Sequence, residues 1–183
     1  LKTLEAYPKV CRIAVNISAA SLLAPRSMDA LMAMTAEAGV LRSRLLFEIT
    51  ESQRLTDLDQ ANRIIAKVRK AGHPVCLDDF GAGLSSFDYL RRFPIDSIKI
   101  DGSFVQHMAV NRFDREIVTA ISGIARSLGY AVGAEKIESE DALAILRETG
   151  IDYGPGYLLH RPQPLADVLA GIAAARRSGL RPL

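Results

Sequence analysis

The chain has 183 residues, of which 49% are hydrophobic, so it is long enough to bury one core and is predicted to form a single domain over residues 1–183. Its formal net charge of +2 comes from lysines and arginines scattered among acidic residues, and the absence of a basic stripe argues against binding to duplex nucleic acid.

No apolar run reaches the roughly 18 residues of a membrane span, and no signal peptide opens the sequence. A cytoplasmic polypeptide is therefore expected, although it could be cut from a longer, membrane-anchored parent. Cys11 and Cys76 lie in apolar runs, which favours two buried thiols over a disulfide.

Short β-rich runs alternate with amphipathic stretches from one end of the chain to the other. In chain order, strands are predicted at 12–18, 45–50, 74–79, 97–101, 130–135 and, from a weaker pattern, 156–160. Helices are predicted between them, around 27–39, 56–71, 85–92, 112–129, 138–149 and 164–177. Expected N-caps are Asp57 and Ser139, and four glycines stand where helices should end: Gly39, Gly72, Gly129 and Gly150.

The stretch from Asn111 to Leu128 shows the helical period well. Its apolar residues recur three or four positions apart and predict one stripe that faces the core. The stripe consists of Phe113, Ile117, Ala120, Ile121, Ile124 and Leu128.

Repeated strand-then-helix units predict an α/β fold with a parallel sheet and helices outside it. Two closures satisfy this pattern, an open doubly wound sheet and a TIM-like (β/α)8 barrel. No G-x-G-x-x-G follows the first strand, so nothing favours a Rossmann-type sheet. Six to seven predicted strands are too few to close an eight-stranded barrel, so one or more strands of such a barrel would be missing from this chain.

Polar residues interrupt the apolar runs where the predicted strands end. They are Asn16, Glu48, Asp78, Asp79, Lys99, Asp101 and Glu135. In a parallel barrel the strand C-termini open on one face, where active sites of this fold lie. Carboxylates this dense repel one another unless cations compensate, and Mg²⁺ or Mn²⁺ ions in a two-ion site suit phosphodiester hydrolysis. Because adjacent strand residues point to opposite faces, Asp78 and Asp79 share this site only if the strand has already turned, as Gly81 and Gly83 just beyond would allow.

The same residues lie in a series of short motifs. These are VNIS at 15–18, FEITES at 47–52, LDDFGAGLSS at 77–86, IKIDGSFV at 98–105 and AEKIE at 134–138. In order and spacing they resemble the EAL family of cyclic di-GMP phosphodiesterases, from about residue 12 to residue 170. The resemblance implies a TIM-like barrel of the EAL type and metal-dependent hydrolysis of one phosphodiester of cyclic di-GMP, which gives linear pGpG.

The resemblance also implies roles for individual residues. It places metal ligands at Asn16, Glu48, Asp78, Asp79 and Asp101, with Asp78 bridging two ions. Lys99 and Glu135 match the pair that contacts and activates the attacking water. Glu51 resembles the glutamate that braces the loop 80–86, which orders the metal site and can couple the subunits of a homodimer.

Three departures from the family pattern bear on activity. The E-A-L segment, which supplies a further metal-ligand glutamate, has no counterpart, because Glu5-Ala6-Tyr7 lies too close to Asn16. Lys136 stands where family members usually carry glycine, which costs about 1–2 kcal/mol if that position needs positive φ; otherwise strand alternation points Lys136 away from the site. Pro155 stands where the family has a glutamine, so the amide contact of that side chain is lost.

Three hypotheses follow from these departures. The first is a phosphodiesterase that is intact in its parent protein and weak or inactive in this chain. The second is a non-catalytic receptor that binds cyclic di-GMP, or a partner protein, through a degenerate site. The third is a remnant without a ligand. The matched site residues favour the first hypothesis. The resemblance also implies that the parent protein could carry a fused sensory or diguanylate cyclase domain.

Overall fold

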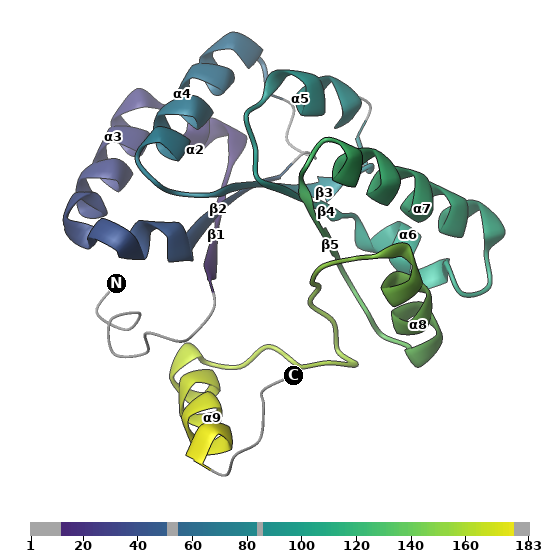
Figure 1. Ribbon diagram of the computed structural model, residues 1–183. Helices are drawn as coiled ribbons and strands as arrows, with labels where there is room; N and C mark the ends of the chain where they lie inside the picture. Colours follow the sequence, from purple (N-terminus) through teal and green to yellow (C-terminus); the bar gives the residue numbers. More distant parts are fainter. Residues whose placement is uncertain (1–11, 51–54, 84–85, 178–183) are drawn as a thin grey trace.

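The computed structural model describes residues 12–50, 55–83 and 86–177. Their strands form one parallel sheet, and its spatial order follows the sequence: β1 (Ile13–Ile17), β2 (Leu45–Thr50), β3 (Val75–Phe80), β4 (Ser97–Ile100) and β5 (Ala131–Ala134). The sheet is curved, and the helices that connect its strands lie on its convex side (Figure 1). This arrangement is the predicted α/β fold with a parallel sheet.

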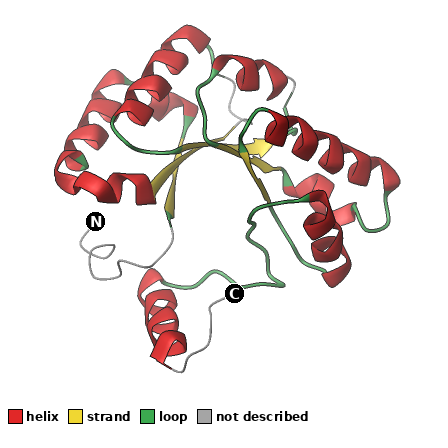
Figure 2. Ribbon diagram, viewed as in Figure 1, coloured by secondary structure: helices red, strands yellow, loops and turns green. Residues whose placement is uncertain are grey.

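Most helices lie where the periodicity predicts them, and Figure 2 shows them outside the sheet. They are α3 (Pro25–Met34), α4 (Leu58–Lys70), α5 (Ser86–Arg92), α7 (Arg112–Ser127), α8 (Glu140–Thr149) and α9 (Leu165–Arg177). Asp57 and Ser139 cap α4 and α8 as predicted, since their side chains accept hydrogen bonds from the backbone N–H groups of Gln60 and Ala142. Gly150 ends α8 with a φ of 75°, a left-handed conformation that favours glycine.

Two local predictions are wrong, and two short helices were missed. Residues 156–160 contain a turn instead of a strand; the chain contacts the sheet earlier, through a single parallel bridge between Tyr153 and Gly133. Two short helices, α2 (Ala19–Leu23) and α6 (Gly102–His107), were not predicted, because five or six residues carry too little of the helical period. Gly39 does not end a helix, because α3 stops at Met34 and the 3-10 helix η1 (Ala36–Arg44) runs through it.

The predicted apolar stripe of α7 only partly faces the core. Ile121 is buried, but the face that packs inward is completed by Val118, Ser122 and Ala125. Three stripe residues remain largely in solvent: Phe113 at 66% exposed, Leu128 at 55% and Ile124 at 41%. The outer side of α7 therefore carries an exposed apolar face.

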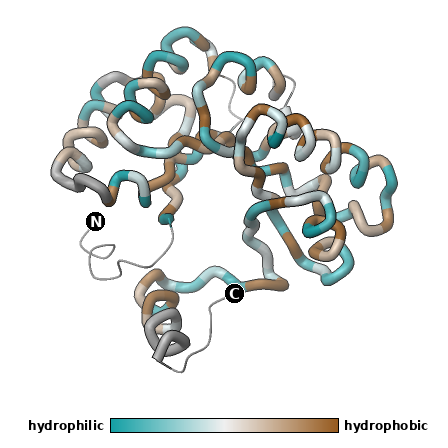
Figure 3. The backbone as a smooth tube through the Cα atoms, viewed as in Figure 1, coloured by the Kyte–Doolittle hydropathy of each residue, from teal (hydrophilic) through white to brown (hydrophobic). Residues whose placement is uncertain are grey.

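The core fills the layer between sheet and helices. The inner strands β3 and β4 are buried on both faces, as is usual for parallel sheets, whereas the edge strand β1 alternates between half-buried and exposed residues before Ile17. The hydrophobic parts of the tube in Figure 3 follow the strands. Phe47, Phe80 and Ile98 are among the fully buried side chains. Cys76 is a buried free thiol, as predicted, whereas Cys11 lies outside the described residues. Among the described helices, none is both long and apolar enough to cross a membrane.

A buried histidine makes the stability of this core depend on pH. His73 is 1% exposed, with Nε2 2.9 Å from Thr35 Oγ1 and Nδ1 3.3 Å from the Leu45 carbonyl. Burial lowers the pKa of His73. Below about pH 6.5 the histidine is therefore protonated in the unfolded chain while it stays neutral in the native state.

His73 therefore lowers the free energy of unfolding as pH drops from 7.5 to 5.5, whereas the carboxylates Glu48, Asp79 and Glu135, whose pKa values burial raises, act in the opposite direction. As pH falls over this range, urea denaturation should show the unmodified protein losing stability relative to His73→Gln, and an identical pH dependence in the two proteins would contradict this assignment.

Candidate functional site

Alternate residues of β2 and of β4, which lie on either side of β3, line one cavity. Leu46 and Glu48 of β2, with Ser97 and Lys99 of β4, line a space of about 820 Å³. Their spacing of two is the period with which strand side chains return to the same face. Parallel register sets Asn16 of β1 beside Glu48. Glu48, Ser97 and Lys99 therefore lie on one face of the sheet, together with Leu46.

Lys99 is the centre of this polar group. Its Nζ lies 2.8 Å from Asp78 Oδ1, 2.9 Å from Glu135 Oε1 and 3.2 Å from Glu48 Oε1, and its side chain is 8% exposed. Burial opposes the charged form, but the hydrogen bond to Asp78 and the nearby carboxylates outweigh it and raise the pKa of Lys99. Lys99 therefore stays protonated at neutral pH, able to donate hydrogen bonds and unable to act as a base.

Asp79 joins Asp78 on the same side because β3 turns early. The register between β3 and β4 shifts between Leu77 and Phe80, and Asp79 has a φ of 54°. This irregularity overrides the alternation of the strand, so the condition for the two aspartates to share a site is met. The turn begins at Asp79 itself and continues through Gly81, whose φ is 100°.

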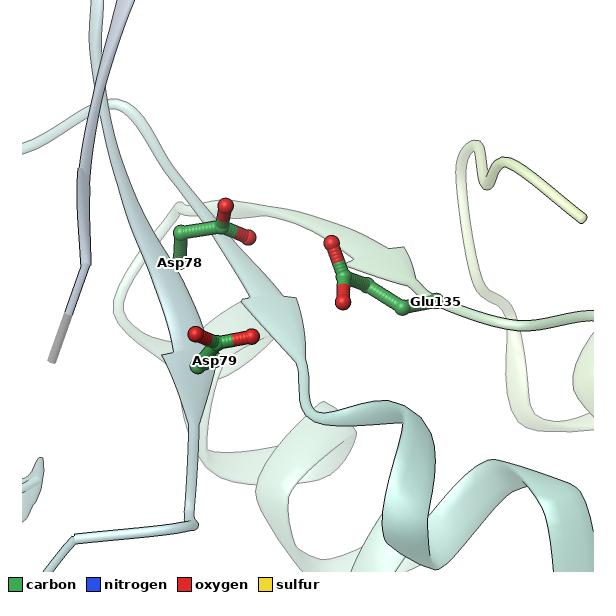
Figure 4. Close-up of side chains that lie close together, drawn as sticks. All are labelled: Asp78, Asp79 and Glu135. Carbon is green, nitrogen blue, oxygen red and sulfur yellow. The ribbon is translucent and has the colours of Figure 1, made fainter. Parts of the chain in front are cut away.

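Three carboxylates now converge, and we call Asp78, Asp79 and Glu135 the acidic cluster. One ligand oxygen from each lies within 4.8 Å of the others. Figure 4 shows the carboxylates of Asp78 and Glu135 facing each other, with Asp79 beside them. Glu48 is joined to this cluster through Lys99, not directly.

The carboxylates are held in an unfavourable environment. Burial raises the pKa of Glu135; the hydrogen bond from Lys99 opposes this and the charge of Asp78 adds to it. Burial likewise raises the pKa of Asp79, and the charges of Asp78 and Asp101 act in the same direction. Burial also raises the pKa of Glu48 against the attraction of Lys99. More negative charge is gathered here than one ammonium neutralises, which is the condition that a divalent cation relieves.

The donor set fits a hard divalent ion. Asp78 Oδ1 is buried and contacts the Lys99 ammonium at 2.8 Å, which leaves the second lone pair of this oxygen without a partner among the described residues. A buried carboxylate oxygen with this free capacity, next to two more carboxylates, matches the oxygen ligands that Mg²⁺ and Mn²⁺ prefer. Asp78 and Asp79 are the residues that would hold such an ion, with Glu135, Glu48 and Asn16 adjacent.

The remaining predicted site residues are placed less centrally. Asp101 caps α6, accepting hydrogen bonds from Ser103 N at 2.8 Å and from Ser103 Oγ, so its carboxylate is engaged there. Pro155 is exposed and borders the cavity, and its carbonyl accepts a hydrogen bond from Ile137 N at 3.2 Å. Glu51 and the segment Glu5-Ala6-Tyr7 lie outside the described residues, so the expectations attached to them stay predictions.

One feature of the site was not predicted, and the structure decides between the two alternatives stated for Lys136. Tyr153 lines the cavity and packs on Gly133, where an added Cβ would lie 2.6 Å from its ring. The glycine in the middle of a strand was the available signal, because such a glycine often marks a close approach. Lys136 has a φ of 52°, so the side chain there carries the cost of about 1–2 kcal/mol considered above. It lines a second cavity together with Glu135, and so does not point away from the site.

The sequence profile of the EAL domain matches residues 1–162. This chain belongs to the EAL-domain family. The EAL domain of a Listeria monocytogenes protein superposes with a TM-score of 0.85 at 32% identity, over 94% of this chain and 69% of that one. The EAL domain of Mycobacterium smegmatis DcpA superposes with a TM-score of 0.84 at 29% identity, over 89% of this chain and 73% of that one. These two solved EAL domains identify the curved sheet as that of a TIM-like barrel.

Relatives with stated activities are similar over most of this EAL domain. The cyclic di-GMP phosphodiesterase PdeF of Escherichia coli is 36% identical over 91% of the chain. The manganese and cyclic di-GMP complex of Klebsiella pneumoniae BlrP1 superposes with a TM-score of 0.78 at 31% identity, over 87% of this chain and 41% of that one. The chain spans only about a fifth of the length of the curated relatives that it matches.

Proposed function

We propose that this EAL domain is a metal-dependent phosphodiesterase that hydrolyses one phosphodiester bond of cyclic di-GMP to give linear pGpG. The observation that carries the proposal is the acidic cluster held around Lys99. Support also comes from relatives named as cyclic di-GMP phosphodiesterases and from a similar structure solved with manganese and cyclic di-GMP.

The site residues have separate roles that follow from their charge and position. Asp78 and Asp79 would hold Mg²⁺ or Mn²⁺, which when bound polarises a phosphoryl oxygen and lowers the pKa of coordinated water. Glu135 accepts a proton from the attacking water, a role that suits a carboxylate whose pKa is raised. Lys99, 2.9 Å from Glu135, orients that carboxylate and presents positive charge to the phosphate.

The second candidate is a receptor that binds cyclic di-GMP without cutting it. Lys99 already forms ion pairs with both Asp78 and Glu135, which offsets part of their charge without a metal. Pro155 cannot offer the amide of the glutamine found in the family. Both features would leave binding in place while lowering turnover.

One experiment separates the two functions. The purified protein is incubated with cyclic di-GMP and Mn²⁺, and pGpG is followed by chromatography while binding is measured by calorimetry in EDTA. Steady accumulation of pGpG supports the enzyme. Saturable binding without pGpG supports the receptor, and neither binding nor product would rule out both.

A homodimer is proposed as a further partner. Phe113, Ile124 and Leu128 form the exposed apolar face of α7, while the helix has Asp114 in its first turn and Arg126 in its last. Two antiparallel copies of α7 would bury this face and bring opposite charges together. Sedimentation should show a dimer that Ile124→Glu weakens and that Thr119→Glu, on another side of α7, leaves intact. A monomer at all concentrations would refute it.

A further inference from the structure

Lys136 adopts a backbone conformation that lysine rarely takes. Asp79 and Lys136 are the two non-glycine residues with positive φ in the described ranges, and both adjoin the acidic cluster. Left-handed backbone is unfavourable for any residue with a Cβ, and such strain persists mainly where surrounding structure imposes it. A glycine would adopt this conformation without strain, so the lysine side chain calls for a physical role.

The stem of Lys136 is fixed against a neighbouring helix. A Cβ added at Gly102, the first residue of α6, would lie 2.5 Å from Lys136 Cδ and 2.6 Å from Lys136 Cγ. The aliphatic part of the side chain therefore lies directly on the glycine backbone, where no larger residue would fit. The ammonium at its end forms no salt bridge with any residue that the structure describes, so its charge is available to a ligand.

That charge lies beside the acidic cluster and next to a cavity. Lys136 directly follows Glu135, a member of the acidic cluster, in the chain. Lys136 also borders a cavity of about 590 Å³, with Glu135, Tyr157 and Arg161 among its lining residues. The guanidinium carbon of Arg161 lies 5.1 Å from the centre of the Tyr157 ring, so this side of the site carries a second positive charge and an aromatic ring.

We propose that the exposed ammonium of Lys136 weakens the attraction of this site for divalent cations and strengthens its attraction for an anionic dinucleotide. One charge produces both effects, because it repels a metal ion and attracts a phosphate. The dinucleotide half of the proposal rests on the proposed function, whereas the metal half rests on the acidic cluster alone. The effect expected from a solvent-facing charge is about two- to fivefold in each affinity.

Three substitutions separate charge from backbone strain. Lys136→Met keeps the stem and the strained backbone but removes the charge, and Lys136→Arg keeps the charge. Lys136→Gly removes both charge and strain. Calorimetry measures the affinity for Mn²⁺ alone and, in EDTA, the affinity for cyclic di-GMP. Scanning calorimetry measures the melting temperature of each protein, which should rise when the backbone strain is removed. Repeating the titrations at high salt tests whether the differences in affinity are electrostatic.

We expect Lys136→Met to bind Mn²⁺ about two- to fivefold more tightly and cyclic di-GMP about two- to fivefold more weakly than the unmodified protein. Lys136→Arg should match the unmodified protein, and Lys136→Gly should bind as Lys136→Met does while melting a few degrees higher. Weaker binding of both ligands by Lys136→Met would indicate a merely structural role and overturn the proposal, as would unchanged Mn²⁺ affinity. If no protein binds cyclic di-GMP, the proposed function fails, and the Mn²⁺ titrations alone decide the role of Lys136. Absence of Mn²⁺ binding in every protein overturns the proposal as well.

Discussion

Asp78→Asn should lower the affinity for Mn²⁺ by more than about 100-fold, since changes outside the ligand shell already cost 10- to 100-fold. Asparagine has nearly the volume of aspartate, so the fold should be kept while one charge of the acidic cluster is lost. Formation of pGpG should fall at least as much, because the bound ion both polarises the phosphate and activates water. Calorimetry with Mn²⁺ and chromatography of pGpG measure the two losses.

A matched control separates the loss of a ligand from the loss of any negative charge. Asp88→Asn removes an aspartate from α5 that forms surface ion pairs with Arg91 and Arg92, away from the cluster. We expect it to leave Mn²⁺ affinity and turnover unchanged, because surface ion pairs contribute little. Equal Mn²⁺ affinity in Asp78→Asn and the unmodified protein would refute the placement of the metal at Asp78.

The parts of the fold and site that follow from local patterns were predictable. The run 45–50 is short and mostly apolar, and 97–101 alternates isoleucines with polar residues, so each predicted a strand whose end carries a polar side chain. Parallel strands bring such ends to one edge of a sheet, and this is why the contact between Lys99 and Glu135 follows from the sequence. Their separation of 36 residues is irrelevant once the topology is known.

The parts that depend on tertiary contacts were not predictable. Strand alternation alone places Asp79 opposite Asp78, and only the register shift against β4 turns it back. Asp101 ends its strand as predicted, yet it is used to cap α6, a helix too short to be recognised from periodicity. The face of α7 that packs on the sheet is decided by the neighbouring helices and strands, so an apolar stripe predicted only that some part of it is buried.

Lys99 should be the residue whose loss destabilises the protein most. Lys99→Met keeps the length and the apolar stem of the side chain but leaves Asp78, Glu48 and Glu135 without their common partner. Removing one partner of a buried ion pair typically costs about 3–5 kcal/mol, because the remaining charge stays buried and uncompensated. Lys67→Met is the matched control: Lys67 pairs with Asp29 at 2.7 Å, but its side chain is 64% exposed, and such pairs contribute at most about 1 kcal/mol.

Scanning calorimetry without metal should show the melting temperature of Lys99→Met lowered by roughly 6–20 °C, from about 2–4 °C per kcal/mol for a chain of this size. Lys67→Met should melt close to the unmodified protein. Mn²⁺ should raise the melting temperature of Lys99→Met more than that of the unmodified protein, because the ion replaces the missing positive charge among the carboxylates. Turnover should stay low even when the fold is restored in this way, since the ion does not replace the hydrogen bond from Lys99 to Glu135. If Lys99→Met has the same melting temperature as the unmodified protein, Lys99 does not hold the carboxylates together. The ion pairs assigned to Lys99 would then be wrong.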